Sequence, residues 1–466
     1  MTAADGGGKL RAAGGAMPAA AASVAVAAPQ PVRAILRRIL ALAAPTSINA
    51  ALQIAAQVAE TWLAARQGTI ALAAWAVVLP FVLLMQQMST GAMGGGVVSA
   101  VARALGARRR DEAAALVLHA LLIALGAGLV FAVALAGFPR AILGAVAGAE
   151  AAEAGAGYVV WLFGLGAVPA WVANTLASVL RGGGRHAMAA RVLGLVWIAH
   201  PPLAWLLMEP LGMGLAGAGA AFAVLFWAAC AVMAVVVLRG GAGFTPSLRV
   251  RPRVALFRRI LAVGLVASML AAVANLTTVL VTAQIAAHGA AAVAAYGISA
   301  RLEFLMIPLA FGIGSALTAL VGGAVGAGDW ATARRIAWTG GLLALAVAGT
   351  VGLAVGVMPR RFAAFFTDDP AVVEVAARAL GIIGPAYGGF GMGMALYFAS
   401  LGAARVRWLV VAGLSRLALA AGGGWALAYG AGMGLEGHFL GVALGITAYG
   451  AVTAASVRPG VWPGRR

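Results

Sequence analysis

Twelve apolar stretches in this chain are each long enough to cross the roughly 30 Å of hydrocarbon in a bilayer. No water is available at that depth to hydrogen-bond the backbone, so stretches of this length are expected to be helices, which satisfy their own amides. Hydrophobic residues make up 63% of the chain and charged residues only 10%, which agrees with a bilayer as the main solvent. The sequence therefore predicts an all-α integral membrane protein with twelve transmembrane helices, near residues 39–65, 70–104, 112–137, 155–181, 186–208, 213–238, 258–285, 291–324, 331–358, 375–402, 406–430 and 436–457.

Lysine and arginine are concentrated in the two terminal segments and in alternate connections between these stretches. Those segments hold 25 of the 32 basic residues, whereas the intervening connections hold only Arg66, Arg140, Arg360, Arg361 and the nearby Arg378. By the positive-inside rule the basic connections and both termini face the cytoplasm, as an even number of spans requires. Orientation in the cell (inner) membrane and anionic lipids of its inner leaflet account for the net charge of +19, so we expect no nucleic-acid partner.

The predicted organisation has five parts. Residues 1–32 form a flexible tail of Ala, Gly and Pro, in which a signal peptide is disfavoured because the apolar run lacks leucine and contains Pro18. An amino-terminal six-helix half at 33–238 and a carboxy-terminal six-helix half at 258–457 are joined by a basic cytoplasmic linker at 239–257, and a second tail follows at 458–466. The single cysteine excludes a disulfide framework.

Short sequence motifs recur at a constant offset of about 220 residues, each at the same place relative to a predicted span. A-A-W-A-V at 73–77 corresponds to A-A-Y-G-I at 294–298, and L-G-A at 105–107 corresponds to V-G-A at 325–327. Because each six-span unit begins and ends on the cytoplasmic side, we expect the halves to be parallel, related by a pseudo-twofold axis along the membrane normal. Two such halves can rock to give alternating access to a ligand between them.

The first predicted helix carries a stripe of polar side chains. Thr46, Asn49, Gln53, Gln57 and Glu60 fall within about 80° of one another at 100° per residue, so they share one face. A charged glutamate inside a span costs roughly 2.5 to 3.5 kcal/mol, which is tolerated mainly where the side chain meets water, a partner or a proton. The stripe therefore predicts a wet cavity in which Glu60 meets water, a partner or a proton; the alternative is a glutamate that reaches out to the membrane surface.

A second carboxylate lies inside the eighth predicted span. Glu303 is close to the middle of that span, and Arg301, two residues away, lies about 160° around the helix from it. Each side chain therefore needs a partner on another helix, and Arg416 in the eleventh span is a candidate. We predict either an ion-coupling role for Glu303 or an interhelical ion pair that fixes packing.

Two milder stripes occur in the second half. On the seventh helix Asn275 and Thr278 share a polar face with Ser268 and Thr282. The tenth helix has an aromatic and methionine face, which suits flat amphipathic cations but is also typical of ordinary helix packing; its members are Tyr387, Phe390, Met394, Tyr397 and Phe398. The five histidines are too scattered along the chain to predict a metal site.

The order of these motifs resembles the multidrug and toxic compound extrusion (MATE) transporters over about residues 34–457. Pro45 precedes Glu60 by fifteen residues and Gly68 follows eight residues later. The other motifs that carry the resemblance are A-L-A-A at 71–74, G-A-R-R-R-D-E-A from 106, L-R-G-G-G-R from 180, G-A-G-D at 326–329 and the stretch 397–405.

This resemblance implies secondary active efflux, in which H⁺ or Na⁺ is exchanged for organic cations and amphipathic drugs. It implies that Glu60 occupies the position of the coupling acid of the first helix, and that Asn174 and Ser178 belong to the cavity of the amino-terminal half. The chain departs from one branch of the family, which has acids in the seventh and tenth helices, because Asn275 and Phe390 occur in those regions. No cofactor is implied beyond the coupling ion.

Other function classes find less support in the sequence. There is no Walker loop, HExxH or intramembrane Ser/His/Asp pattern, so we expect an antiporter and not an enzyme. A flippase for lipid-linked oligosaccharides of the same superfamily is the alternative within transport, although it would line its cavity with several basic residues. A non-transporting structural or sensory membrane protein is the alternative from another class. We expect a monomer whose partners are small molecules and membrane lipids.

Overall fold

The computed structural model describes residues 31–462, so most of the predicted tail at 1–32 and the end of the tail at 458–466 lie outside the described residues. Within that range the chain is helical apart from connecting turns and one isolated bridge between Pro459 and Trp462. Eleven helices are long and apolar enough to cross a membrane, and two further segments that meet at 43° form a twelfth span. An all-α membrane protein with twelve spans is therefore confirmed.

The amino-terminal half contains six spans, and short π-helical turns (η) interrupt three of them. In chain order the elements are α1 (Val32–Arg66), α2 (Thr69–Gln86) with η1 (Gln87–Ala92) and α3 (Met93–Gly106), α4 (Arg110–Phe131) with η2 (Ala132–Ala136), α5 (Pro139–Val159) with η3 (Val160–Leu165) and α6 (Ala167–Gly182), α7 (His186–Met208), and α8 (Ala216–Leu238). Such π-helical turns loosen the hydrogen-bond ladder locally, and buried neighbours support them within the bundle.

The carboxy-terminal half repeats this order. Its first helix begins at Val254, slightly before the predicted start at 258. In chain order the elements are α9 (Val254–Ala286), α10 (Ala290–Gly326), α11 (Trp330–Val357), the short α12 (Pro359–Ala364), α13 (Pro370–Ile383) with η4 (Gly384–Ala386) and α14 (Tyr387–Gly402), α15 (Arg407–Leu417) with η5 (Ala418–Gly423) and η6 (Ala426–Gly430), and α16 (Leu435–Ser456).

Backbone conformations repeat at the same offset as the sequence motifs. Arg108 and Gly328, which correspond at that offset, both have left-handed φ angles, of 59° and 77°. Gly184 and Ala404 correspond in the same way, and their φ angles are 77° and 53°. Each pair ends a helix with a residue in the left-handed region, where glycine is the least strained choice. The predicted duplication is therefore present in the backbone.

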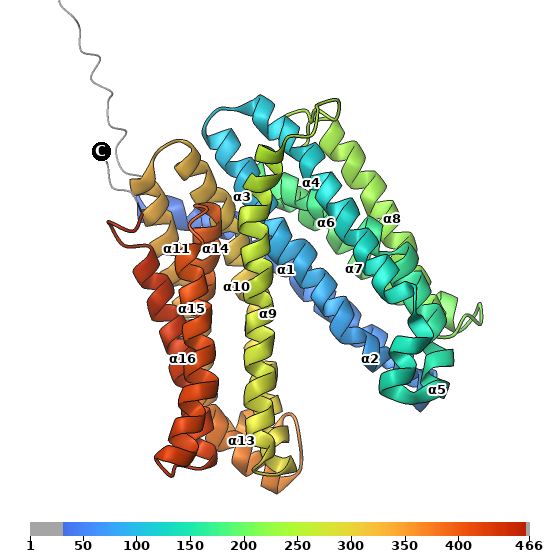
Figure 1. Cartoon of the computed structure of the whole chain (residues 1–466), viewed down its shortest axis with the longest axis vertical. Helices are drawn as coiled ribbons and strands as arrows, with labels where there is room; N and C mark the ends of the chain where they lie inside the picture. The colour runs from blue at the N-terminus through green and yellow to red at the C-terminus, as the bar shows by residue number, and fades with distance from the viewer. Residues whose placement is uncertain (1–30, 463–466) are drawn as a thin grey trace, which may run out of the picture.

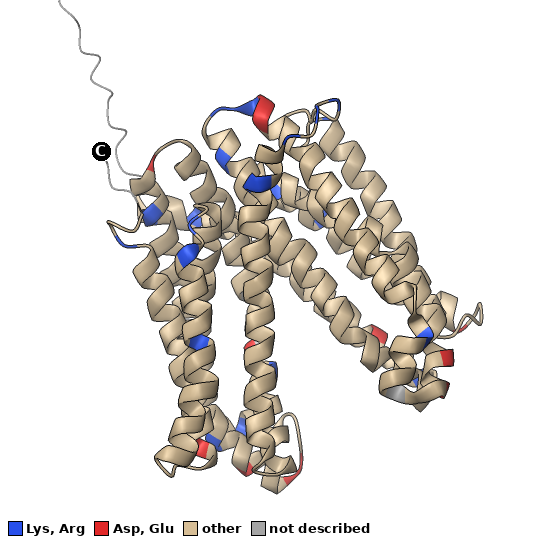
Figure 2. Ribbon diagram, viewed as in Figure 1, with Lys and Arg blue, Asp and Glu red and all other residues tan. Residues whose placement is uncertain are grey.

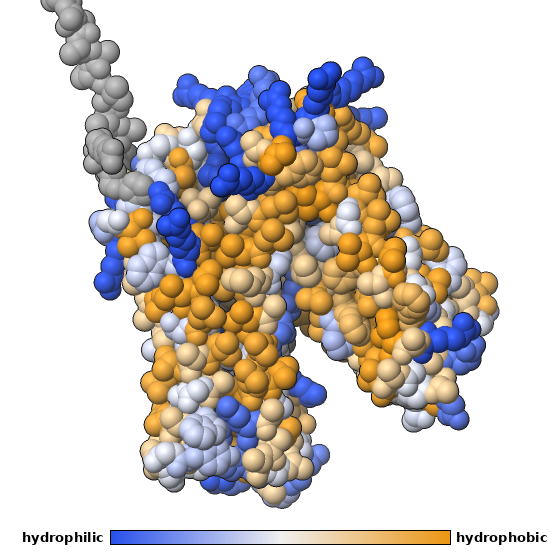
Figure 3. All heavy atoms as spheres, viewed as in Figure 1, coloured by the Kyte–Doolittle hydropathy of each residue, from blue (hydrophilic) through white to orange (hydrophobic). Residues whose placement is uncertain are grey.

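The two halves form separate lobes that diverge from a shared end (Figure 1). We call this shared end the basic end; it carries the turns at 107–109, 183–185, 239–253, 327–329 and 403–406. Lysine and arginine gather there (Figure 2), and the opposite end we call the lobed end. Figure 3 shows a V-shaped cleft that separates the lobes and opens at the lobed end; hydrophilic residues cover much of the basic end and form smaller patches at the lobed end.

Glycine contacts bring the lobes together at the basic end. A Cβ atom added to Gly106 would collide with the backbone of Gly323, and one added to Gly326 would collide with the backbone of Arg103. Arg103 and Gly323 themselves correspond at the repeat offset, as Gly106 and Gly326 do, so the contact obeys the pseudo-twofold relation. The Arg103 guanidinium also donates to the carbonyl oxygen of Gly402, at 3.1 Å. Small residues thus allow α3 and α10 to cross closely and close this end of the cleft.

Candidate functional site

Glu60 is buried inside the amino-terminal lobe, where side chains from three other helices surround it. Only 9% of the surface of this residue is exposed to solvent. The Tyr158 hydroxyl on α5 donates to Glu60 Oε1 at 2.7 Å, and the Trp75 indole N–H on α2 donates to the same oxygen at 3.1 Å. His200 Nε2 on α7 lies 3.7 Å from Glu60 Oε2. The carboxylate therefore faces protein groups, and the interpretation of Glu60 as reaching out to the membrane surface was wrong.

Small residues on α5 allow this convergence. A Cβ atom on Gly155 would lie 2.8 Å from the Cβ atom of Ala74, and one on Gly157 would lie 3.1 Å from that of Ala216. Glycine at both positions lets α5 approach α2 and α8 closely, which places Tyr158 beside the end of α1. The close packing of these helices thus sets the distance of the shortest hydrogen bond to Glu60.

The polar stripe of α1 faces α7 and lies within the amino-terminal lobe. Thr46 Oγ1 lies 3.2 Å from His186 Nδ1 at the start of α7. Asn49 and Gln57 each keep one buried polar atom, Oδ1 and Nε2 respectively, that has no hydrogen-bond partner among the described residues, while Gln53 is half-buried. These unpaired buried atoms mark the part of the α1 stripe where a water or ion would find polar partners.

A separate polar cluster lies further along the same lobe, on α6 and at the junction of α2 and η1. Asn174 Nδ2 donates to Ser89 Oγ at 3.0 Å and to Gln86 Oε1 at 3.4 Å. Ser178 donates to the carbonyl oxygen of Asn174 in the preceding turn. None of these hydrogen bonds connects the cluster with Glu60, so Asn174 and Ser178 belong to the amino-terminal lobe without direct contact with its buried carboxylate.

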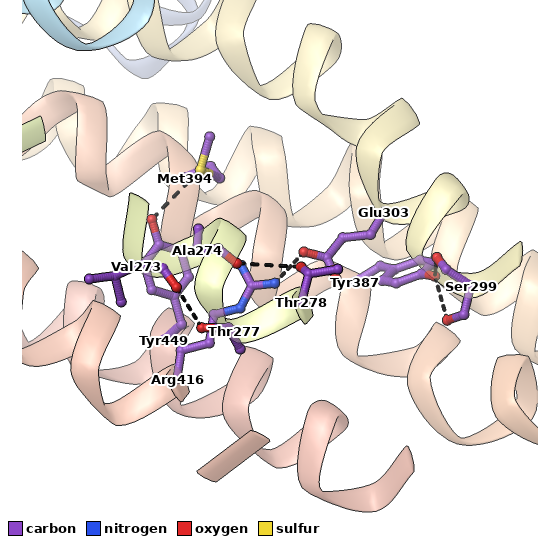
Figure 4. Close-up of polar contacts among 10 residues, drawn as sticks. All are labelled: Val273, Ala274, Thr277, Thr278, Ser299, Glu303, Tyr387, Met394, Arg416 and Tyr449. Atoms are coloured by element: carbon purple, nitrogen blue, oxygen red, sulfur yellow. Dashed lines mark hydrogen bonds and ion pairs between the residues drawn. The ribbon is translucent and has the colours of Figure 1, made fainter. Parts of the chain in front are cut away.

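The second buried carboxylate has a resident counter-charge. Arg416 Nη2 donates to Glu303 Oε1, and this ion pair joins α15 to α10 (Figure 4). The Glu303 and Arg416 side chains are 18% and 12% exposed, and the guanidinium lies 5.4 Å from the ring centroid of Phe390. The predicted partnership of Glu303 with Arg416 is confirmed.

Arg301, for which a partner on another helix was expected, has an exposed side chain. Arg181 at the end of α6, by contrast, is buried, and its guanidinium lies 5.9 Å from the ring of Phe311. A position close to a predicted helix end made Arg181 look like a loop residue. Burial of basic groups could therefore not be judged from their place along the chain.

The other predicted cavity residues of the second half bond mostly within their own lobe. Asn275 is exposed and its amide donates to the Ala271 carbonyl at 2.9 Å, while Thr278 donates to Ala274 at 3.4 Å. Tyr387 is fully buried and donates to the Ser299 carbonyl at 3.0 Å (Figure 4).

Two residues of the aromatic face of the tenth span, a face that lies on α14, remain partly accessible. Met394 is half-buried and its sulfur accepts a hydrogen bond from Tyr449 at 3.6 Å, and Tyr397 is half-buried with its ring centroid 5.2 Å from that of Phe398. Phe390 and Phe398 are buried. Part of the aromatic face of α14 therefore packs inside the lobe. Met394 and Tyr397 remain the candidates on this face for ligand contact.

Sequence reasoning missed three residues around Glu60 and the proximity of two histidines. Tyr158, Trp75 and His200 were not predicted as partners of the carboxylate, although each is a scarce polar group within an apolar span. His200 lies within α7, which continues past it to Met208. His288 and His438 are far apart in the sequence, but their ring centroids are 5.3 Å apart.

Comparison with known proteins covers both halves. A family model described as MatE matches residues 45–206 and again residues 264–425, so the second match repeats the first at nearly the offset of the sequence motifs. No curated protein sequence matches the chain.

Solved structures of membrane transporters are similar to the whole fold. A Vibrio cholerae MATE transporter, VcmN, in its bent form is 19% identical, with a TM-score of 0.83 over 91% of this chain and 97% of that one. A MOP superfamily transporter from Pyrococcus furiosus, described as having a binding pocket of reversed polarity, is 21% identical, with a TM-score of 0.83 over 91% and 95%. An outward-facing multidrug resistance MATE transporter of the MOP superfamily is 21% identical, with a TM-score of 0.82 over 92% and 97%.

Proposed function

The chain belongs to the MATE family of membrane transporters, and on this premise we propose that it is a proton-coupled antiporter that expels cationic, amphipathic small molecules, with Glu60 as the coupling residue. As a member of this family it is a transporter and not an enzyme. The coupling ion, the substrates and the residues involved are parts of the proposal.

The observation that carries the proposal is the set of partners around Glu60. Two of them, Tyr158 and Trp75, are neutral donors, and the third, His200, is an imidazole that can itself accept a proton. The carboxylate has no arginine or lysine partner among the described residues. Its charge is therefore left to be neutralised by an exchangeable cation, and competition between a proton and a cationic substrate would give exchange.

The same partners favour H⁺ over Na⁺. A hard metal cation needs several oxygen ligands around it, by analogy with the oxygen-rich sites of Ca²⁺ and Mg²⁺. Around Glu60 the neighbouring groups are an indole N–H, one phenol oxygen and an imidazole nitrogen. Asn174 and Ser178, which could supply oxygens, belong to the separate cluster with Gln86 and Ser89 and make no hydrogen bond to Glu60.

The shape of the molecule supports alternating access. The cleft between the lobes opens at the lobed end, and close glycine contacts hold the basic end together (Figure 3). With the basic end in the cytoplasm, this is an outward-open arrangement of a monomer in the cell membrane, with both termini inside and anionic lipids of the inner leaflet against the basic loops. Met394 and Tyr397 are the proposed contacts for the apolar part of a substrate.

The decisive experiment measures proton movement driven by a lipophilic cation in proteoliposomes that contain the protein and a pH-sensitive dye. Glu60→Gln keeps an oxygen that accepts from Tyr158 but removes the titrating group, so we expect substrate-driven proton movement to be lost while the purified protein keeps its thermal stability. Proton movement at the normal rate in this variant would exclude Glu60 as the coupling residue.

Glu209→Gln is the matched control. Glu209 lies in the turn between α7 and α8, and its carboxylate accepts a hydrogen bond from the Arg66 guanidinium at 2.7 Å. That hydrogen bond lowers the pKa of the Glu209 carboxyl, which therefore stays ionised through the cycle. We expect normal transport from this variant. Replacing the proton gradient by a sodium gradient tests Na⁺ coupling in the same vesicles, and translocation of a lipid-linked oligosaccharide would instead support the flippase alternative.

A further inference from the structure

A shallow cavity lies at the lobed end of the carboxy-terminal lobe, where α11 ends and α12 and α13 follow. Its volume is about 500 Å³. Arg360, Arg361, Arg378 and Glu374 line it together with apolar residues that include Val357 and Met358. Figure 1 places α13 at the foot of this lobe, and Figure 2 shows basic and acidic residues gathered there.

The cavity has a surplus of positive charge. Arg360 forms an ion pair with Glu374 at 2.8 Å, and Arg378 lies 3.6 Å from a carboxylate oxygen of Glu436, which is not a lining residue. Arg361 has no carboxylate partner among the described residues; its guanidinium instead lies 3.8 Å from the sulfur of Met358. Three guanidinium groups thus border the cavity against one carboxylate of its own lining.

The amino-terminal lobe is different at the same end. Its two arginines in this region are each paired with one glutamate, Arg66 with Glu209 at 2.7 Å and Arg140 with Glu153 at 2.8 Å. Both lobes therefore carry arginine at the end where the positive-inside rule disfavours it, but only the carboxy-terminal lobe has there an arginine, Arg361, without a carboxylate partner among the described residues. An anionic ligand would supply the counter-charge that Arg361 lacks.

Large apolar side chains project beside the arginines. Val357, the last residue of α11, is 78% exposed, and Phe365, directly after α12, is 85% exposed. At the end of a membrane span, apolar side chains of this kind are suited to acyl chains and guanidinium groups to the headgroup layer. The cavity therefore combines a cationic part and an apolar part at the depth where a phospholipid presents its phosphate and the start of its acyl chains.

We propose that this cavity is a binding site for an anionic phospholipid of the leaflet at the lobed end. Arg361 and Arg378 bind the headgroup phosphate, because a guanidinium presents a planar fork of donors that matches phosphate oxygens. Val357 and Phe365 contact the acyl chains. The site is separate from Glu60 and from the cleft, so it does not depend on which ion or substrate the transporter uses.

The test uses the full-length protein in mild detergent with phosphatidylglycerol or phosphatidylcholine of identical acyl chains, and native mass spectrometry counts the lipids retained. We expect one phosphatidylglycerol to remain bound far longer than any phosphatidylcholine. Arg361→Gln and Arg378→Gln should each weaken its retention on the order of fivefold, the usual effect of one basic residue near anionic lipid. Both side chains are exposed, so neither variant should affect folding.

Arg140→Gln serves as the matched control, since it removes an arginine at the same end of the other lobe; it should leave retention unchanged. Equal retention of the two lipids, or equal losses in the control and in the Arg361→Gln and Arg378→Gln variants, would overturn the proposal. A third arm adds inorganic phosphate. Complete displacement of the lipid by millimolar phosphate would assign the site to a free anion and would also overturn the proposal.

Discussion

The two lobes have similar backbone folds, but the partners of their buried carboxylates differ. In the amino-terminal lobe Glu60 accepts hydrogen bonds from the Tyr158 hydroxyl and the Trp75 indole, and it lies near the His200 imidazole. In the carboxy-terminal lobe Glu303 forms an ion pair with the guanidinium of Arg416, which is a fixed counter-charge of the protein itself. A carboxylate that already has a permanent counter-charge gains little from a second cation, whereas one held by neutral donors still needs one. The two acids are not equivalent in the repeat, because Leu280 corresponds to Glu60 and Leu83 to Glu303. On the proposed function, the partner of each acid separates an exchange role for Glu60 from a packing role for Glu303.

The largest expected effect concerns the ion pair of the carboxy-terminal lobe. Glu303→Gln leaves the largely buried guanidinium of Arg416 without its counter-charge, which should reduce the free energy of unfolding by about 3–5 kcal/mol. Chemical denaturation of the purified protein in detergent measures this loss. The double variant Glu303→Gln/Arg416→Gln removes both charges and should recover most of the stability.

Transport by that double variant separates the two predictions for Glu303. If the pair only fixes packing, a stable double variant transports normally. A stable double variant without proton movement would instead give Glu303 an ion-coupling role and would remove the contrast between the lobes. An unchanged unfolding free energy in Glu303→Gln would show that the pair does not stabilise the fold.

A smaller effect is expected from the hydrogen bond between Tyr158 and Glu60. Tyr158→Phe removes the shorter of the two bonds to the carboxylate, and a hydrogen bond to a charged group contributes about 1.5–3 kcal/mol. We expect the rate of substrate-driven proton movement to fall roughly 10- to 100-fold, since about 1.4 kcal/mol corresponds to a factor of ten. Tyr449→Phe is the control, because that hydroxyl donates to the Met394 thioether in the other lobe and not to Glu60. Similar rates in the two variants would contradict a special role for the Glu60 site.

The smallest effect tests the shared backbone. Ala404 has a left-handed φ of 53° where the corresponding residue of the other half is Gly184, with a φ of 77°. Ala404→Gly should raise the free energy of unfolding by about 1 kcal/mol because it relieves the steric cost of a Cβ atom in this region. Gly184→Ala should lower it by a similar amount. Changes of the same sign in the two variants would show that the two turns are not equivalent.

Much of the fold could be predicted from the sequence because the relevant signals are local. The length of each apolar stretch set the number of spans, and the two longest predictions, near 70–104 and 291–324, differ from α2–α3 and α10 by no more than two residues at either end. The bent span was placed less well. It was expected near 155–181, whereas the span begins at Gly148, whose φ of 86° separates it from the preceding helical segment that starts at Pro139.

The candidate site could be predicted only in part. Helical periodicity put Thr46 and Glu60 on one face, and the cost of a buried charge marked Glu60 and Glu303 as important. Periodicity describes one helix at a time, however, and Tyr158 approaches Glu60 from a distant part of the sequence because glycines on α5 allow a close crossing.

By itself the sequence therefore determined a duplicated twelve-helix membrane bundle with one acid in the first helix and another in the eighth. Hydrophobic length, charge bias and repeat offset are properties of short segments, and they persist whatever the helices pack against. Tertiary structure decided which acid meets neutral donors and which meets arginine, and which arginines are buried or exposed. Those outcomes depend on how closely and at what rotation separate helices cross, which is set by contacts between residues far apart in the chain.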